Sequence, residues 1–166
     1  ENLIFYNNQL TGWRGITMYD GSDSTEFRYV RISGGTKEKG GGISMLSASP
    51  TLTHVSILNN ISIGSDNSHI YTGGGVYLAG SNPTISHTTI ANNYARATGG
   101  GMYVEGSEPI LNNVLIVDNT GWGGGGIFYK VSLLIFDNNY LFYFFSLIAL
   151  NLLFLILSNN LKVRDK

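Results

Sequence analysis

Four glycine-rich segments in this sequence have a composition that is typical of phosphate-binding loops. Triple glycines end at Gly42, Gly75 and Gly101, and a run of four ends at Gly126. Such loops bind phosphate where their backbone N–H groups lead into a helix, and the nucleotide-binding version continues to Gly-Lys-Ser/Thr. No run here continues in that way, and each is followed by an apolar residue that opens a strand-like segment. The glycines therefore predict tight turns and not a nucleotide site.

Two histidines at equal spacing are the next candidates, because imidazole is a common metal ligand. His54 and His87 each follow a proline by four residues, but the third residue at this offset is Asn113. Asn is a residue that tolerates unusual backbone angles, so the pattern favours a structural corner. The chain has no Cys, which excludes cysteine metal sites, thiol nucleophiles and disulfides. We expect neither a metal nor a cofactor.

Carboxylates for acid–base catalysis do not form a recognisable set. Asp20, Asp23 and Glu26 cluster before one strand-like segment, and a second cluster lies farther along the chain at Glu105 and Glu108. Glycoside hydrolysis needs two carboxylates facing each other across a cleft. The two clusters occupy different offsets in the repeat described below, so stacking does not bring them together. We predict solvated surface acids and no catalytic residues.

The glycine runs belong to an internal repeat. Each of the first three runs is followed by an apolar residue and, seven residues after that, by a proline: Pro50, Pro83 and Pro109. Nine and ten residues beyond the prolines lie polar pairs: Asn59-Asn60, Asn92-Asn93 and Asp118-Asn119. The glycine runs are 33, 26 and 25 residues apart, and this spacing varies only between the polar pair and the next run. Three features at fixed offsets in three copies indicate a solenoid.

Alternating apolar residues within each unit predict short, half-buried strands. Inward positions are expected at Ile43, Met45, Leu52, Val55 and Ile57 and at their equivalents in the other units, down to Leu111, Val114 and Ile116. Equal offsets place equivalent strands about 4.8 Å apart in parallel register, and parallel crossovers are right-handed. The prediction is an all-β fold, a single-stranded right-handed parallel β-helix of about five coils over residues 1–130. Its coils start near residues 15, 42, 75, 101 and 126.

Stacked coils place equivalent side chains in ladders. His54, His87 and Asn113 are expected at the corner between two short strands, and Asn60, Asn93 and Asn119 at the exit of the next strand. Amide side chains at one level can hydrogen-bond to those at the next. Both ladders are expected to be structural.

Segments of variable length separate the polar pairs from the glycine runs, and we expect them to be loops on one edge of the stack. That edge carries our candidate ligand-binding residues: His69, Tyr71, Tyr94, Arg96 and Trp122. Aromatic faces and a guanidinium group suit sugar rings or a protein partner. The alternative is that the rings only cover the loop side of the coil.

By these residues the chain resembles right-handed parallel β-helix repeat proteins of bacterial surfaces, which share the pectin-lyase-like fold. It is most similar to the polymorphic outer-membrane-protein, adhesin-type repeat, whose units open with Gly-Gly-Ala-Ile/Val and end in aromatic-x-x-Asn. Ile57, Ile90 and Ile116 stand here where that repeat has Phe. The resemblance implies adhesion, carbohydrate binding or polysaccharide cleavage, and the last would need acids for Ca²⁺ and an Arg or Lys base on one face.

The repeat pattern ends near Lys130. An uncharged run from 140 to 157 is just long enough to span a membrane as a helix, and Lys162, Arg164 and Lys166 follow it. Residues 131–166 are interpreted as a membrane anchor, a cap on the coil stack or a frame-shifted segment. Net charge of −1 with 13% charged residues argues against a nucleic-acid partner.

The function predicted from these patterns is that of a non-catalytic, surface-exposed scaffold for adhesion or for binding a glycan or protein. We expect a fragment of a larger exported bacterial protein, located at the cell surface, in the outer membrane or outside the cell. Its partners would be a polysaccharide or a cell-surface protein, with membrane contact through 140–157. The alternative is a β-helix polysaccharide lyase or glycoside hydrolase acting on acidic polysaccharide.

Overall fold

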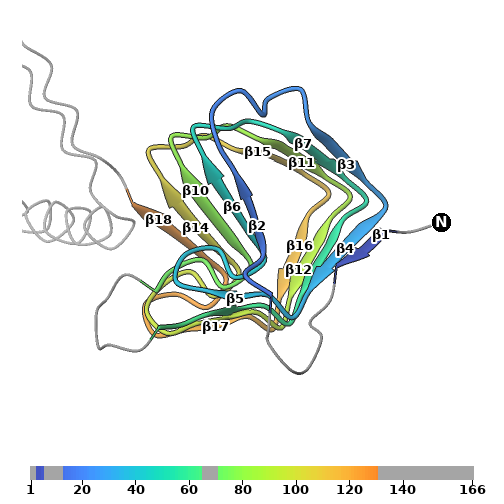
Figure 1. Cartoon of the computed structure of the whole chain (residues 1–166). Coiled ribbons are helices and arrows are strands. Elements are labelled where there is room, and N and C mark those ends of the chain that lie inside the picture. The colour runs from blue at the N-terminus through green and yellow to red at the C-terminus, as the bar shows by residue number, and fades with distance from the viewer. Residues whose placement is uncertain (1–2, 6–12, 65–70, 131–166) are drawn as a thin grey trace, which may run out of the picture. The chain divides into compact units, whose positions relative to one another are not determined.

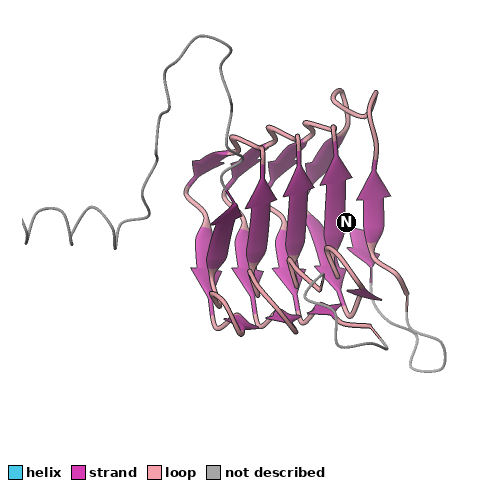
Figure 2. Ribbon diagram, turned by 90° about the vertical axis from the view of Figure 1, so that its left-hand side faces the viewer, coloured by secondary structure: helices cyan, strands magenta, loops and turns pink. Residues whose placement is uncertain are grey.

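The computed structural model of the protein describes residues 3–5, 13–64 and 71–130. These residues form short β-strands joined by turns, and none of them is helical. Viewed along the stack in Figure 1, equivalent strands lie over one another, and the side view in Figure 2 shows them as parallel rows. The predicted all-β parallel β-helix is confirmed. The predicted apolar tail, 131–166, with its candidate membrane segment 140–157, lies outside the described residues.

Each complete coil has four strands. The first contains β2 (Ile16–Met18), β3 (Glu26–Arg28), β4 (Val30–Ser33) and β5 (Thr36–Lys37). The second contains β6 (Ile43–Leu46), β7 (Thr51–Thr53), β8 (Ser56–Leu58) and β9 (Ile61–Ser62). The third contains β10 (Val76–Ala79), β11 (Thr84–Ser86), β12 (Thr89–Ala91) and β13 (Tyr94–Ala95). The fourth contains β14 (Met102–Glu105), β15 (Ile110–Asn112), β16 (Leu115–Val117) and β17 (Thr120–Gly121). Strand β1 (Leu3–Phe5) precedes these coils and β18 (Ile127–Lys130) follows them.

The strands pair only with their copies in neighbouring coils, which produces four parallel sheets. We call them the glycine sheet (β2, β6, β10, β14, β18), the proline sheet (β3, β7, β11, β15), the asparagine sheet (β1, β4, β8, β12, β16) and the fourth sheet (β5, β9, β13, β17). Their register is the one that the repeat predicts, since Val76 pairs with both Ile43 and Met102 in the glycine sheet. Equivalent sequence positions therefore form straight columns.

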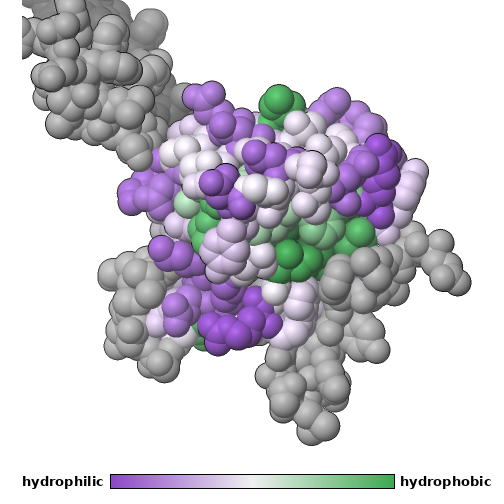
Figure 3. Space-filling model, turned by 45° about the horizontal axis from the view of Figure 1, so that its top comes forward, coloured by the Kyte–Doolittle hydropathy of each residue, from purple (hydrophilic) through white to green (hydrophobic). Residues whose placement is uncertain are grey.

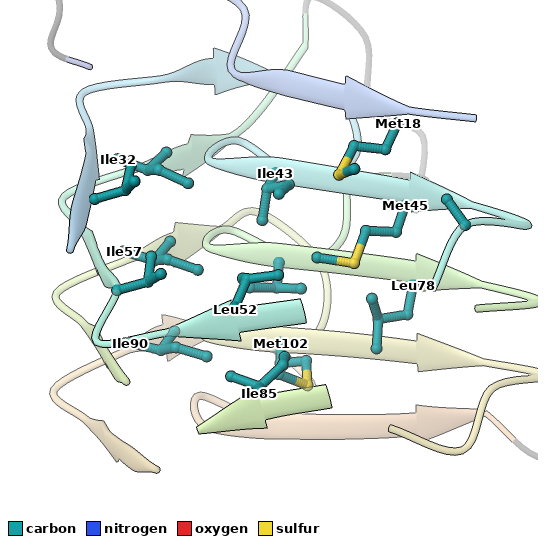
Figure 4. Close-up of a cluster of buried hydrophobic side chains, with 14 of the residues drawn as sticks. Met18, Ile32, Ile43, Met45, Leu52, Ile57, Leu78, Ile85, Ile90 and Met102 are labelled. Atoms are coloured by element: carbon teal, nitrogen blue, oxygen red, sulfur yellow. The ribbon is translucent and has the colours of Figure 1, made fainter. Parts of the chain in front are cut away.

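The main core lies inside the coils, between the first three sheets. Figure 4 shows its side chains stacked level by level, with Met45 from the glycine sheet, Leu52 from the proline sheet and Ile57 from the asparagine sheet. These three side chains are fully buried. The inward positions predicted from the alternation are confirmed for the middle coils.

The last coil departs from this prediction. Leu111 occupies the same column as the fully buried Ile85, yet it is 39% exposed. Strand β15 is the outermost strand of its sheet, so no further described coil packs against that side. At this end of the stack, an inward residue without a further described coil beside it stays partly exposed.

The triple glycines turn the chain between the fourth sheet and the glycine sheet. Gly73 has a φ of 65°, and a Cβ added there would collide with the carbonyl oxygen of Val76. A Cβ at Gly75 would lie 2.9 Å from Nδ2 of Asn93. The first glycine is therefore needed for its backbone conformation and the third for close packing against a side-chain amide.

The fourth sheet corrects the prediction that the variable segments are loops throughout. Strands β9 and β13 begin directly after the polar pairs, and β5 and β17 extend the same sheet. The alternation that specifies them is present in "ISI" at 61–63 and in "YARA" at 94–97, where exposed and buried residues alternate. Only the residues beyond these strands form loops of variable length.

The molecular surface is chemically mixed. On the face drawn in Figure 3, hydrophobic residues occupy a band between hydrophilic regions. A binding surface must therefore be located from particular residues and not from an extended apolar face.

Candidate functional site

The His54 corner forms a stacked column between the proline and asparagine sheets. Tyr29, His54, His87 and Asn113 all have φ values between 49° and 55°, in the left-handed region. The ring centroids lie 4.8 Å apart for Tyr29 and His54, and 4.9 Å apart for His54 and His87. Nδ2 of Asn113 lies 3.3 Å from Nε2 of His87. Stacking fixes these residues in the turn, and the described residues contain no group of three potential metal ligands.

The asparagine ladder lies inside the turn between the asparagine sheet and the fourth sheet. Oδ1 of Asn93 accepts hydrogen bonds from the backbone N–H and Nδ2 of Asn60, at 2.9 and 3.0 Å. Oδ1 of Asn119 accepts the same pair of bonds from Asn93, each at 2.9 Å. Each Nδ2 also donates to a strand carbonyl, for Asn93 that of Ile57 at 2.9 Å. The buried amides thus satisfy one another and the backbone, which is a structural role.

The outer face of the fourth sheet brings together three of the five predicted ligand-binding residues. Tyr94 lies in β13, directly beside Ile61 of β9, and Arg96 and Trp122 follow β13 and β17 in the alternating register. Tyr94 is 40% exposed and Trp122 is 82% exposed. We call Ile61, Ile63, Tyr94, Arg96 and Trp122 the fourth-sheet face. The sheet itself is labelled at β5 and β17 in Figure 1.

Ile61 and Ile63 extend this face and were not among the predicted residues. They are 38% and 40% exposed, whereas Ser62 between them is fully buried. The signal that could have identified them is the alternation of "ISI" directly after the Asn59-Asn60 pair. Exposed aliphatic residues beside aromatic rings are suited to the apolar faces of a partner.

Tyr71 does not lie on the surface with the other candidates. It is only 2% exposed, because its ring packs against Gly64 and beneath the Arg96 guanidinium, whose Cζ lies 5.8 Å from the ring centroid. Arg96 also donates a hydrogen bond to the carbonyl oxygen of Gly64 at 3.3 Å. The placement of Tyr71 on an exposed edge was therefore wrong, and its ring supports Arg96 from below. His69 lies outside the described residues.

Two of the acidic residues singled out in the sequence, Glu26 and Glu105, lie in different sheets, and Asp20, Asp23 and Glu108 lie outside the strands. Glu26 in β3 forms an ion pair with Arg28 at 2.5 Å, and Glu105 in β14 forms one with Lys130 at 2.5 Å. The Lys130 ammonium is the main reason why the pKa of Glu105 is lowered. Oδ1 of Asp23 accepts a hydrogen bond from the backbone N–H of Ser49. These carboxylates have individual structural partners and do not converge.

Coils in one fixed parallel register, with a buried asparagine ladder and a stacked column at the exposed corner, define a parallel β-helix solenoid. The model of the family described as "right handed beta helix region" matches residues 1–144. The chain belongs to this family. Comparisons with curated proteins and with solved structures found no match. Among the described residues, no helix is long and apolar enough to cross a membrane.

Proposed function

We propose that this chain is a non-catalytic scaffold that binds a glycan through the fourth-sheet face, as part of an exported protein at the cell surface. The observation that carries the proposal is the high exposure of Trp122, which is 82% exposed on the same face as Tyr94. Large aromatic residues at such exposure commonly contact partners, and their flat rings stack on the apolar faces of sugars. The β-helix presents them from a rigid support.

The size of the face favours a glycan over a stable protein partner. The face extends over three strands at about 4.8 Å spacing, with about three residues of each, and so spans roughly 10 by 7 Å. A stable protein partner buries about 800 Å² on each side, which is several times larger. A few sugar units match the available area.

The test is to measure glycan binding by the full chain on an array of bacterial and host polysaccharides, followed by titration of hits. Trp122→Ala and Tyr94→Ala should each weaken binding at least tenfold, because each removes one stacking platform. Tyr19→Ala removes a tyrosine that is 62% exposed in another part of the coil, and it should leave affinity unchanged. Equal affinity for all three variants, or binding only to a protein, would refute the proposal.

An assay for eliminase and hydrolase activity on acidic polysaccharides with Ca²⁺ separates the scaffold from the enzyme alternative. We expect no turnover. Robust depolymerisation would replace the scaffold with a catalytic function. Protease accessibility of the chain on intact cells tests the proposed location.

A further inference from the structure

A second packed layer lies between the glycine sheet and the buried side of the fourth sheet. One column of outward side chains runs across the glycine sheet in register: Thr17, Ser44, Tyr77, Tyr103 and Phe128. The three rings are stacked with centroids 5.4 Å apart. At the N-terminal end of this column the side chains are the small hydroxyl residues Thr17 and Ser44, and no ring is present there. The layer is therefore apolar in the later coils and polar in the first two.

Lys37 of β5 reaches into this polar end. Its Nζ donates hydrogen bonds to Oγ1 of Thr17 and, at 3.2 Å, to Oγ of Ser44. Ser44 is 2% exposed, and its hydroxyl donates to the carbonyl oxygen of Lys39 at 2.5 Å. An ammonium group has three N–H donors, so one donor of Lys37 has no acceptor among the described residues. The hydroxyl hydrogen of Thr17 likewise has none.

The charge of Lys37 is not compensated by a neighbouring carboxylate. The ion pairs among the described residues are Arg28 with Glu26 and Lys130 with Glu105, and neither involves Lys37. Burial lowers the pKa of Lys37, and the positive charge of Arg14 lowers it further. A half-buried cation normally has a counter-charge, because desolvating it alone is unfavourable.

We propose that Lys37 and Thr17 form a binding site for an oxyanion, either a carboxylate or a sulfate group. The unused N–H of Lys37 and the O–H of Thr17 are two donors on side chains that are hydrogen-bonded to each other, and the positive charge of Arg14 acts on Lys37 as well. Charge-assisted hydrogen bonds of this kind are the usual means of holding such groups. The site is separate from the fourth-sheet face, so it does not depend on the proposed function.

The site differs from a simple cap on the end of the polar layer in one measurable way. If Lys37 only covers this end, its replacement by Met destabilises the protein in every buffer. If it is retained for an anion, Lys37→Met is at least as stable as the wild type in chloride, because an uncompensated charge has been removed. The stabilisation that added oxyanion gives to the wild type is then lost in the variant.

The experiment titrates the full chain, labelled at lysine and threonine, with sodium sulfate and with sodium glucuronate at constant ionic strength. We expect saturable shifts of the Lys37 side-chain and Thr17 methyl NMR signals with at least one anion. Lys37→Met should weaken binding at least tenfold, and Lys37→Arg should largely retain it. Lys130→Met removes an exposed, ion-paired lysine and should leave the titration unchanged.

If only one of the two anions binds, the result identifies whether the ligand group is a sulfate or a carboxylate. If both bind, the site accepts oxyanions in general. Shifts that never saturate, or equal affinity in wild type and Lys37→Met, would overturn the proposal. If Lys37→Met does not fold, Thr17→Val carries the test, because it removes one donor while conserving volume. Unchanged affinity in Thr17→Val would then count against the site.

Discussion

Asn60, Asn93 and Asn119 repeat one set of hydrogen bonds at three levels of the stack. Each amide joins its neighbour along the stack and also a backbone carbonyl of the asparagine sheet. A buried polar group is stable only when such partners are present. Loss of one asparagine would therefore remove hydrogen-bond partners from its neighbour in the ladder.

Replacing Asn93 with Ala should destabilise the protein by about 2–4 kcal/mol, since it leaves the buried backbone N–H of Asn60 without its acceptor and removes the bond from Nδ2 of Asn60. Asn112→Ala is the control, because Asn112 is an exposed strand residue and its change should stay within about 0.5 kcal/mol. Urea denaturation of both variants measures the difference. Equal stability of the two would contradict the role of the ladder.

The buried hydroxyl of Tyr77 should make the folded state less stable at alkaline pH. Its hydroxyl donates to Oε2 of Glu105 at 3.1 Å, and burial together with this carboxylate raises the pKa of Tyr77 from 10.0 to about 12. A raised acid pKa means that the folded state keeps a proton that the unfolded chain has lost. The contribution is therefore complete below pH 10 and is lost as the pH rises towards 12.

Stability measured from pH 8 to 12 should decline less steeply in Tyr77→Phe than in the wild type, because the variant has no phenol at this position. Tyr19→Phe is the matched control, since Tyr19 is 62% exposed. The same slope in all three proteins would show that the burial of Tyr77 does not govern the alkaline transition.

The turn between the fourth sheet and the glycine sheet is the element on which each coil depends. It must bring the chain back close to the asparagine ladder and open the next strand in register. Glycine is required there for two separable reasons, a left-handed backbone and the absence of a Cβ.

Gly73→Ala and Gly80→Ala separate these two requirements. Both residues have positive φ, 65° and 58°, but a Cβ at Gly80 would meet only Oγ of Ser47 at 3.6 Å. Gly80→Ala should lower stability by about 1–2 kcal/mol from backbone strain alone. Gly73→Ala should cost clearly more, because its Cβ collides with the Val76 carbonyl. Equal thermal shifts would show that close packing at the turn is unimportant.

At the scale of the whole molecule, burial depends on a residue's position along the stack. Leu52 and Leu111 occupy one column of the proline sheet, joined through Ile85. Leu52 is fully buried, and Leu111 in the outermost strand is 39% exposed. The same residue type at the same repeat position thus contributes differently to stability.

Leu52→Ala should destabilise the protein by about 2–5 kcal/mol, because the cavity it leaves is enclosed by coils on both sides. Leu111→Ala should cost about 1 kcal/mol or less, since it loses less buried surface. Chemical denaturation of the two variants under one set of conditions gives the comparison. A larger loss for Leu111→Ala would mean that the end of the stack is covered in solution.

The sequence predicts where the fourth-sheet face lies, but it does not predict every residue that the face contains. Tyr94, Arg96 and Trp122 share an edge because they follow equivalent polar pairs at similar offsets. The burial of Tyr71 was not predictable, since it depends on the packing of its ring against Gly64 and Arg96. Lys37 was also missed, because its hydroxyl partners come from other segments of the coil.

The sequence by itself determined the coil, its register and its ladders, because a repeat at fixed offsets admits one way of stacking equivalent strands. The tertiary structure alone decided the enclosure of Tyr71 and the polar end around Lys37. These features arise where one sheet packs against the outside of another. The distance between such surfaces is set by side-chain volumes from several coils, and no single segment encodes it.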